Sequence, residues 1–191
     1  MWRVNASVYR RDLWSVIDLT RPRKISRHHA RAIRKGGARV AVRRDAGDEA
    51  YSELHRVVVD SLARRHGVKP VHTLDELRLL RDLFPDSIDL WIAEDHLDMV
   101  VAAVWVFRFQ SRCWHAQYIA ADLAGMELNA THLVLESIAN AALAESVQYF
   151  SMGCGTEDGG AILNAGLFDF KSGFGFGSVI QDFYRIDLTS L

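Results

Sequence analysis

The sequence predicts a mixed α/β fold in which a mostly antiparallel central sheet is flanked by helices and one helix crosses over between two strands. Two observations lead to this prediction. Apolar residues recur at three- and four-residue intervals between residues 48 and 84, whereas residues 88–120 alternate or form continuous apolar runs. A strand, a helix and a strand then follow one another over residues 112–152, an order that requires a crossover, usually right-handed and parallel.

The bulk composition is ordinary for a folded protein and excludes several classes. The chain has 191 residues, 49% hydrophobic and 25% charged, which is enough to bury one core. A net charge of −1 excludes a whole-molecule field directed at nucleic acid or an acidic membrane. Cys113 and Cys154 form neither a metal pattern nor a disulfide scaffold, which favours a reducing compartment. No apolar run is long enough for a membrane span, and a signal-peptide layout is missing, so we expect a cytoplasmic protein.

The beginning of the chain differs in character from the rest. Residues 1–20 mix polar and apolar positions and predict a short structured arm. We therefore expect residues 1–45 to form an N-terminal arm and a basic helix, packed on a domain that comprises residues 46–191.

A strongly basic segment follows the arm. Residues 21–44 hold ten Lys or Arg and no acidic residue, and Gly36-Gly37 interrupts them. The simplest interpretation is a helix from about residue 26 to residue 35, followed by a strand over residues 39–42. This segment could contact the phosphates of an RNA, a nucleotide-linked sugar or coenzyme A, but a solvated basic helix face is the commoner explanation.

Two amphipathic helices come next. Residues 48–65 predict a helix with apolar side chains on one face, and Gly67 is suited to end it. Thr73 and Glu76 form a capping box, in which each side chain satisfies a free backbone N–H at the start of the second helix. Pro85 ends that helix because a proline ring cannot continue it.

Three strands are then predicted to form an antiparallel meander. Residues 88–92 alternate, and residues 95–98 have the composition of a hairpin turn. Residues 99–109 are almost wholly apolar, which suits a central strand buried on both faces. Residues 112–120 complete the meander.

The crossover unit occupies the remaining chain. Asn129 is expected to cap a helix over residues 130–145, and a strand over residues 147–152 follows it. A glycine-rich loop of residues 153–165 leads to a short helix and to a last strand over residues 178–188.

This order of elements resembles the GNAT fold of the N-acetyltransferase superfamily. After the strand that ends at Gly153, residues 166–175 read Gly-Leu-x-x-Phe-Lys-x-x-Phe-Gly. This motif resembles the FemAB-like and cellulose-biosynthesis-type branch, and the arginine-rich residues 27–37 resemble a helix of the same branch. The resemblance extends from about residue 24 to residue 188.

The resemblance implies an N-acyltransferase that moves an acyl group from acetyl-CoA or another acyl-CoA to a small-molecule amine. The acceptor would be an amino sugar or a cell-envelope precursor. In such enzymes the pyrophosphate lies on backbone N–H groups where the crossover helix starts, which is a natural anion site. Here that place holds the following residues: Gly125, Asn129, Ala130 and Thr131. The usual glycine-rich phosphate signature is missing, and the alternative is that Gly125 simply turns the chain. Gly153 is expected in the pocket floor.

Lys171 is the strongest candidate for a catalytic residue. The resemblance places it near the acyl carrier, where a cation neutralises a phosphate or an oxyanion; the alternative is a surface lysine. His115 and Gln117 share one face of a strand by period two and can line a cleft. His115 suits a general base, with a bound water or a purely structural histidine as the alternatives. Cys154 lacks a recognisable base for nucleophilic catalysis.

Several other interpretations remain open. His28-His29 lacks a third ligand at metal spacing, so we predict no metal site. The chain could instead be a catalytically silent GNAT-fold binding module, half of a larger assembly or a homodimer. A further alternative is a transferase whose donor is an aminoacyl-tRNA. An RNA contact through residues 21–44 is not favoured.

Overall fold

The computed structural model describes residues 6–186, apart from the side chain of His66. Its centre is a seven-stranded sheet with the order β2-β3-β4-β5-β6-β1-β9. All neighbouring strands are antiparallel except β5 and β6. The predicted α/β fold is therefore confirmed. The strands of the sheet are β1 (Ala6–Asp18), β2 (Ala41–Arg44), β3 (Ile88–Glu94), β4 (Val100–Phe109), β5 (Cys113–Ala121), β6 (Tyr149–Cys154) and β9 (Gly177–Ile186).

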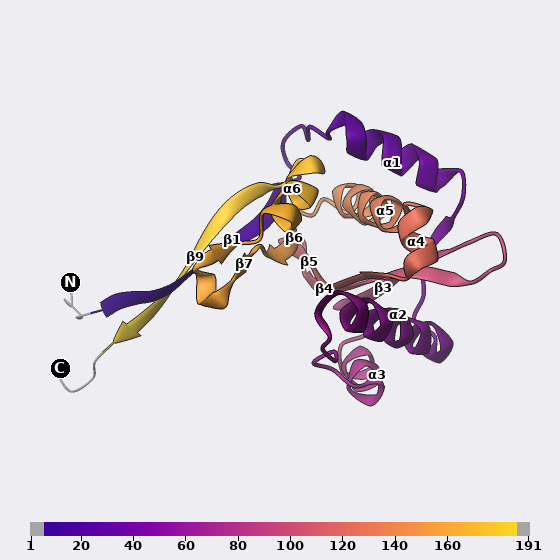
Figure 1. Cartoon of the computed structure of the whole chain (residues 1–191), viewed down its shortest axis with the longest axis horizontal. Helices are drawn as coiled ribbons and strands as arrows, with labels where there is room; N and C mark the ends of the chain where they lie inside the picture. Colours follow the sequence, from indigo (N-terminus) through magenta and orange to yellow (C-terminus); the bar gives the residue numbers. More distant parts are fainter. Residues whose placement is uncertain (1–5, 187–191) are drawn as a thin grey trace.

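Helices cover both faces of the sheet (Figure 1). On one face lie α1 (Arg27–Gly37), α5 (Ala130–Ala144) and α6 (Ala165–Gly173), and on the other lie α2 (Asp48–His66) and α3 (Leu74–Leu83). Each face has its own apolar core, and the β4 side chains contribute to both. Among the helices of residues 6–186, none is long and apolar enough to cross a membrane.

The predicted end of α2 and the predicted capping box of α3 are confirmed. Gly67 has the left-handed φ of 65° that ends α2, and glycine tolerates this conformation at low cost. At the start of α3, the Thr73 hydroxyl accepts from the Glu76 amide while the Glu76 carboxylate accepts from the Thr73 amide. These ends are readable from the sequence because the groups that satisfy them lie within a few residues of each other.

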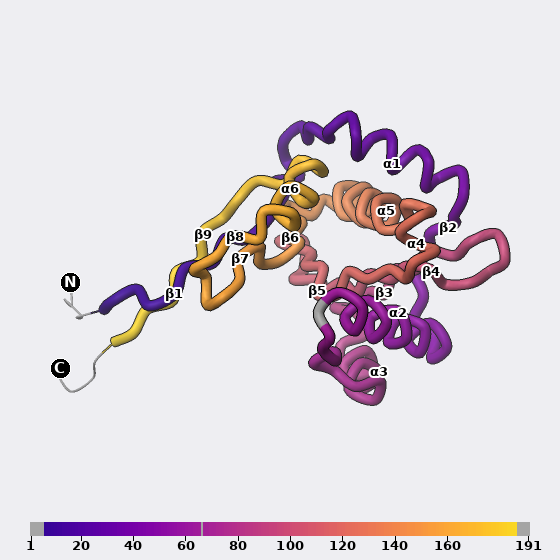
Figure 2. Tube along the Cα trace, viewed as in Figure 1, coloured from indigo at the N-terminus to yellow at the C-terminus, as the bar shows by residue number. Residues whose placement is uncertain are grey.

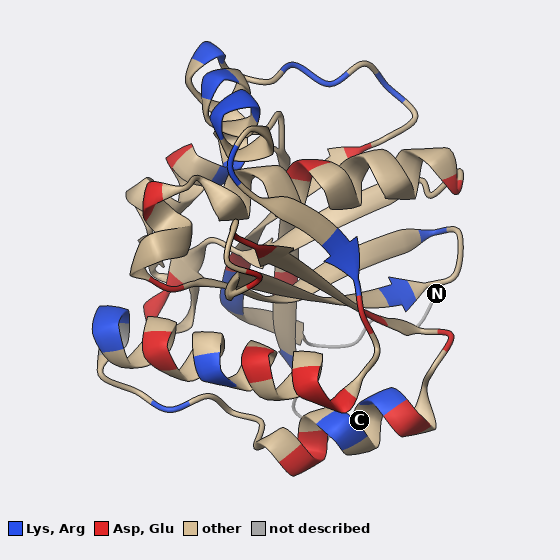
Figure 3. Cartoon of the chain, turned by 90° about the vertical axis from the view of Figure 1, so that its right-hand side faces the viewer, with Lys and Arg blue, Asp and Glu red and all other residues tan. Residues whose placement is uncertain are grey.

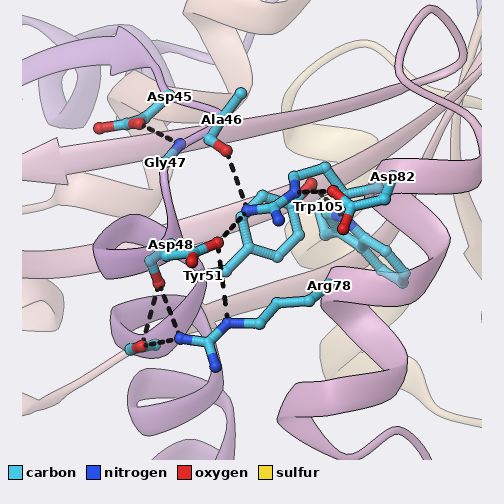
Figure 4. Close-up of polar contacts among 10 residues, drawn as sticks. Asp45, Ala46, Gly47, Asp48, Tyr51, Arg78, Asp82 and Trp105 are labelled. Atoms are coloured by element: carbon cyan, nitrogen blue, oxygen red, sulfur yellow. Dashed lines mark hydrogen bonds and ion pairs between the residues drawn. The ribbon is translucent and has the colours of Figure 1, made fainter.

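A polar network joins α2 to α3 and reaches the sheet (Figure 4). Arg78 and Arg81 of α3 bind Asp48 at the start of α2, and the Arg81 guanidinium lies 5.0 Å from the ring centroid of Tyr51. The fully buried Trp105 of β4 donates from its indole nitrogen to the Tyr51 hydroxyl at 3.3 Å. Burial also raises the pKa of Tyr51, so this phenol stays neutral and available as an acceptor.

Replacing Tyr51 by phenylalanine is expected to reduce the free energy of unfolding by about 1–2 kcal/mol, because the Trp105 N–H loses its acceptor inside the core. Urea denaturation measures the change. Tyr149→Phe is the matched control, because it makes the same chemical change where the hydroxyl accepts an exposed hydrogen bond from Gln148 at 3.1 Å. Equal stability of Tyr51→Phe and the wild type would contradict the prediction.

The predicted meander and crossover are confirmed. Strand β4 pairs antiparallel with β3 and with β5, its neighbours along the chain. After α5, strand β6 pairs with β5 in parallel. One detail is wrong: Asn129 does not cap α5 with its side chain. It has a φ of 60°, which asparagine tolerates, because the chain turns sharply from the short helix α4 (Leu123–Glu127) into α5.

The beginning of the chain differs from the prediction. Instead of an arm packed on the domain, residues 6–18 form β1, which lies between β6 and β9 inside the sheet. Register shifts between Val8 and Arg10 and between Trp14 and Val16 interrupt the alternation that would have indicated a strand. The expected residues 1–5 of the arm lie outside the described part, and the division at residue 45 stays a prediction.

Two boundaries also change, and the predicted glycine-rich loop contains a hairpin. Helix α1 continues through both glycines because Gly36 packs against α5, where a Cβ would lie 3.0 Å from the Asn129 carbonyl oxygen. The strand expected over residues 39–42 is β2, two residues later. Within the glycine-rich loop, β7 (Thr156–Glu157) and β8 (Ile162–Leu163) form a small hairpin beside β1 (Figure 2). Residues 187–188 of the predicted last strand lie outside the described residues.

Candidate active site

The parallel strands β5 and β6 separate after a short stretch of pairing. Their register holds for three residues and ends at His115 opposite Ser151, although β5 continues to Ala121 and β6 to Cys154. Beyond this point the two strands open a cleft in the sheet. Two adjoining cavities, of about 650 and 370 Å³, occupy it. They share four lining residues, so we treat them as halves of one site: Ile119, Met152, Leu167 and Lys171.

Lys171 lies where the two halves meet. Its side chain is only 3% exposed, which excludes the surface-lysine alternative. The ammonium group donates to the carbonyl oxygens of Gly153 at 3.2 Å and Cys154 at 2.7 Å. Burial lowers the pKa of Lys171 to about 8. Since an ammonium has three N–H donors, one remains for a ligand in the cleft.

His115 and Gln117 line the smaller half of the cleft together with Lys171 and Gly153. The His115 Nδ1 atom lies 3.2 Å from the Ser151 hydroxyl oxygen. Burial lowers the pKa of His115, the Lys171 ammonium lowers it further, and a hydrogen bond with Gln117 opposes these effects. The imidazole is therefore neutral at neutral pH and can accept a proton. The predicted grouping of these side chains agrees with the geometry, while their catalytic roles stay a prediction.

The larger half of the cleft reaches the start of α5. Asn129, Thr131 and His132 line it, and the first amides of a helix have no partner within the helix. With the positive end of the helix dipole, they form a place where an anion is stabilised. Ala130 is fully buried and lines neither half of the cleft, so the geometry does not support the expected contact of this residue with a phosphate. Arg65 brings a positive charge to the same half.

Gly125 has a structural role that the sequence does not indicate. It also lines the larger half, but its amide donates to the Asp122 carboxylate at 2.8 Å. A Cβ atom at this position would lie 2.1 Å from the Val101 carbonyl oxygen of β4. The residue is glycine because α4 packs closely on the sheet, and its occupied amide does not support the expected binding of a phosphate.

The cleft contains residues that sequence reasoning missed. Trp14 of β1 lines the smaller half, with its ring 5.6 Å from that of His115. His132 lies 5.0 Å from the ring of His29, and burial lowers its pKa to about 4. The residues around Trp14 and His132 in the sequence do not indicate a place in the cleft, because the fold brings these two side chains there from distant segments.

The basic segment forms an exposed face on α1 (Figure 3). Most of its cations lie on the solvent side, whereas Ala32 and Gly36 face α5. Four exposed cations of α1 form no ion pair with any acidic residue of the described chain: Arg27, Arg31, Arg34 and Lys35. The C-terminal end of this face lies beside the start of α5, where Arg39 donates to the Glu127 carbonyl oxygen at 3.4 Å.

A family model described as an acetyltransferase (GNAT) domain matches residues 22–171. The chain therefore belongs to this family, and it is an acyltransferase-type enzyme domain. This confirms the resemblance to the GNAT superfamily that the sequence indicated. No relative is found among curated proteins.

Solved structures agree at the level of the fold. The chain resembles FemX with a TM-score of 0.72 at 10% identity, over 93% of this chain and 62% of FemX. It resembles the C-terminal domain of a putative lysylphosphatidylglycerol synthetase from Agrobacterium fabrum with a TM-score of 0.66 at 10% identity, over 98% and 62% of the two chains. It resembles L-PGS from Bacillus licheniformis with a TM-score of 0.66 at 13% identity, over 94% of this chain and 60% of L-PGS. The chain thus spans about three fifths of the length of these structures, and its fold is that of FemAB-like proteins.

Proposed function

We propose that this chain transfers an acyl group from acyl-CoA to an amine within the β5–β6 cleft. One observation carries the proposal: a buried lysine with a lowered pKa and a neutral histidine line the same cavity, beside a helix N-terminus. The donor would lie in the larger half with its pyrophosphate at the start of α5. The acceptor amine would approach through the smaller half.

Each polar group has a task in this reaction. An amine bound as ammonium must lose a proton before it attacks, and His115 or a water beside it takes that proton. As the new C–N bond forms, the thioester carbonyl oxygen gains negative charge, which the free N–H of Lys171 stabilises. The attacking nitrogen then loses its second proton, the C–S bond breaks and the sulfur takes up that proton, so that coenzyme A leaves as the thiol. Gln117 orients the imidazole through its hydrogen bond.

The pH dependence of kcat/KM follows from the lowered pKa values of Lys171 and His115. Lys171 must keep its proton, and its pKa of about 8 means that the cation is lost as the pH rises through this value. We expect kcat/KM to fall about tenfold per pH unit above this point, since kcat/KM reports the free enzyme. The lowered pKa of His115 keeps the base neutral into the mildly acidic range. A Lys171→Arg variant that is active should lack the alkaline decline, because arginine stays charged; an unchanged decline would contradict the assignment.

Isothermal titration with acetyl-CoA tests the donor, and release of the coenzyme A thiol in the presence of glucosamine tests the transfer. Binding together with amine-dependent thiol release is the expected result. If neither occurs, the catalytically silent binding module becomes the better description. The names of the lysylphosphatidylglycerol synthetases indicate aminoacyl transfer to a lipid, which supports a cell-envelope acceptor as the class to try next.

A second candidate is an aminoacyl-tRNA as the donor, which the exposed cations of α1 favour because they lie beside the start of α5. This candidate predicts tRNA binding that weakens steeply with salt, and its loss when Arg31, Arg34 and Lys35 are replaced by glutamate. Lys69→Glu, at an exposed position away from α1, is the control. Binding that does not depend on salt would remove this candidate.

A further inference from the structure

The charges around the smaller half of the β5–β6 cleft restrict the kind of amine that it receives. Among the described residues that line this half, Lys171 is a cation and none is a carboxylate. The Asp12 carboxylate of β1 does not line it, and it already accepts from the Arg10 guanidinium at 2.7 Å and from the Thr156 hydroxyl at 3.2 Å. A substrate ammonium would therefore meet a buried positive charge and no group of opposite sign.

The larger half of the cleft is also rich in positive charge. Within the described chain, one carboxylate lines it, that of Glu157, which accepts from the Asn164 side chain at 2.6 Å. Arg65 lines the same half, and the start of α5 adds the positive end of the helix dipole. This field suits the phosphates of a donor and disfavours an acceptor that carries a charge of the same sign.

The walls of the smaller half are largely apolar or aromatic. Ile119, Met152 and Leu167 form part of them. Trp14 forms another part, with its ring 5.6 Å from that of His115. An indole offers a large flat surface on which another ring stacks favourably. These walls suit an acceptor whose amino group is attached to a ring.

The number of protons to be moved favours an amine that arrives uncharged. An ammonium loses two protons on becoming an amide, whereas an uncharged amine loses one. Burial lowers the pKa of His115, so this imidazole is free to accept a proton, while Lys171, with a pKa of about 8, keeps its own at neutral pH. One imidazole suffices to carry one proton from the attacking nitrogen to the leaving sulfur.

We infer that the acceptor is a weakly basic amine attached to a ring, which binds in its uncharged form with the ring against Trp14. Aromatic amines and amino sugars share this chemistry, because conjugation in the first and neighbouring oxygen atoms in the second withdraw electrons from the nitrogen. The uncharged nitrogen attacks the thioester carbon, and His115 takes the one proton that it releases. The C–S bond breaks as His115 returns this proton to the sulfur, and coenzyme A leaves as the thiol. The inference rests on the proposed acyl transfer.

Thiol release from acetyl-CoA with three ring amines tests the inference: aniline, glucosamine and the strongly basic cyclohexylamine. At about pH 7.5, kcat/KM for the better of the two weakly basic amines should exceed that for cyclohexylamine at least about tenfold, since a base as strong as lysine is uncharged in only about one molecule in a thousand. Between about pH 6 and 7.5, KM for cyclohexylamine should fall about tenfold per pH unit as its uncharged fraction rises, while KM for aniline stays constant.

The outcomes separate this inference from the proposed function. If cyclohexylamine is accepted as efficiently as the better weak base, or if its KM does not change with pH, the acceptor binds as an ammonium; the inference is then overturned while the proposed function stands. If no amine releases the thiol, the proposed function itself fails. A higher kcat/KM for glucosamine than for aniline identifies an amino sugar as the acceptor, and the reverse order identifies an aromatic amine.

A pair of variants at Leu167 tests the charge argument by a gain of function. Leu167 lines both halves of the cleft and is 37% exposed, so a longer polar side chain fits there. Leu167→Glu places a carboxylate in the cleft and should lower KM for cyclohexylamine, because its ammonium form then binds. Leu167→Gln has the same size without the charge and should leave this KM unchanged. Equal KM values for the two variants would overturn the charge argument.

The contact with Trp14 has its own test. Trp14→Leu should raise KM for the preferred ring amine about three- to tenfold through the loss of stacking, and it should leave KM for acetyl-CoA unchanged. Tyr9→Leu is the matched control, because Tyr9 is an exposed aromatic residue of the same strand that lines neither half of the cleft. Equal effects of the two variants on KM for the amine would show that the ring does not lie against Trp14.

Discussion

Replacing Lys171 by methionine is expected to lower kcat/KM by about 10²–10³-fold, the loss typical when one donor to a developing oxyanion is removed. Methionine keeps most of the buried volume but removes the charge and all three N–H donors. The expected loss therefore falls on kcat more than on KM, because the charge that Lys171 stabilises develops only during the reaction. Steady-state assays of thiol release measure both parameters.

The control must separate catalysis from folding, because Lys171 also holds the carbonyl groups of Gly153 and Cys154. Lys69→Met makes the same chemical change at an exposed lysine and should leave kcat/KM unchanged. Thermal unfolding of both variants shows whether the fold persists. A folded Lys171→Met variant whose kcat/KM lies within threefold of the wild type would remove Lys171 from the reaction.

Gly125→Ala is expected to reduce the free energy of unfolding by about 3 kcal/mol or more, at the upper end of the costs of overpacking. The new Cβ would lie 2.1 Å from the carbonyl oxygen of Val101 and 2.8 Å from its carbonyl carbon. Both are backbone atoms of β4, so no side chain can move aside. Helix α4 must shift away from the sheet, and the larger half of the cleft changes shape with it.

Gly37→Ala makes the matched comparison for this glycine. Gly37 is the last residue of α1, and a Cβ there would meet only the Leu133 Cδ1 atom at an ordinary 3.7 Å. Because alanine restricts the unfolded chain, this change should be neutral or stabilise the protein by up to about 1 kcal/mol. Urea denaturation of the two variants gives the difference. Similar stabilities would contradict the packing role assigned to Gly125.

Two features of the site could be predicted from the sequence. Lys171 stands in a motif whose resemblance to known acyltransferases placed it at the site, and α6 indeed brings it into the cleft. His115 and Gln117 could be paired by the period of a strand, which is a local property. The degree of burial of Lys171 was not predictable, because it depends on β6 and on α6 packing against it.

Other features of the site depend on segments far apart in the chain. The cleft exists because β5 and β6 stop pairing after His115 and Ser151, which lie 36 positions apart. Trp14 enters it only because β1 inserts beside β6. The constraint on Gly125 comes from Val101 of another strand. No local pattern encodes these distances, since they arise when the sheet assembles.

Elements that close their hydrogen bonds locally could be predicted from the residue pattern alone. Residues a few positions apart set the helix ends at Gly67 and Thr73 and the hairpin at Asp95. The meander and the crossover follow from the order of the predicted elements along the chain. Three features became visible only in the folded chain: residues 6–18 form an inner strand, the sheet opens beyond His115, and Lys171 is buried there with its pKa lowered. The physical reason is the same in each case. Strand pairing and desolvation depend on neighbours in space, which a pattern along the chain does not record.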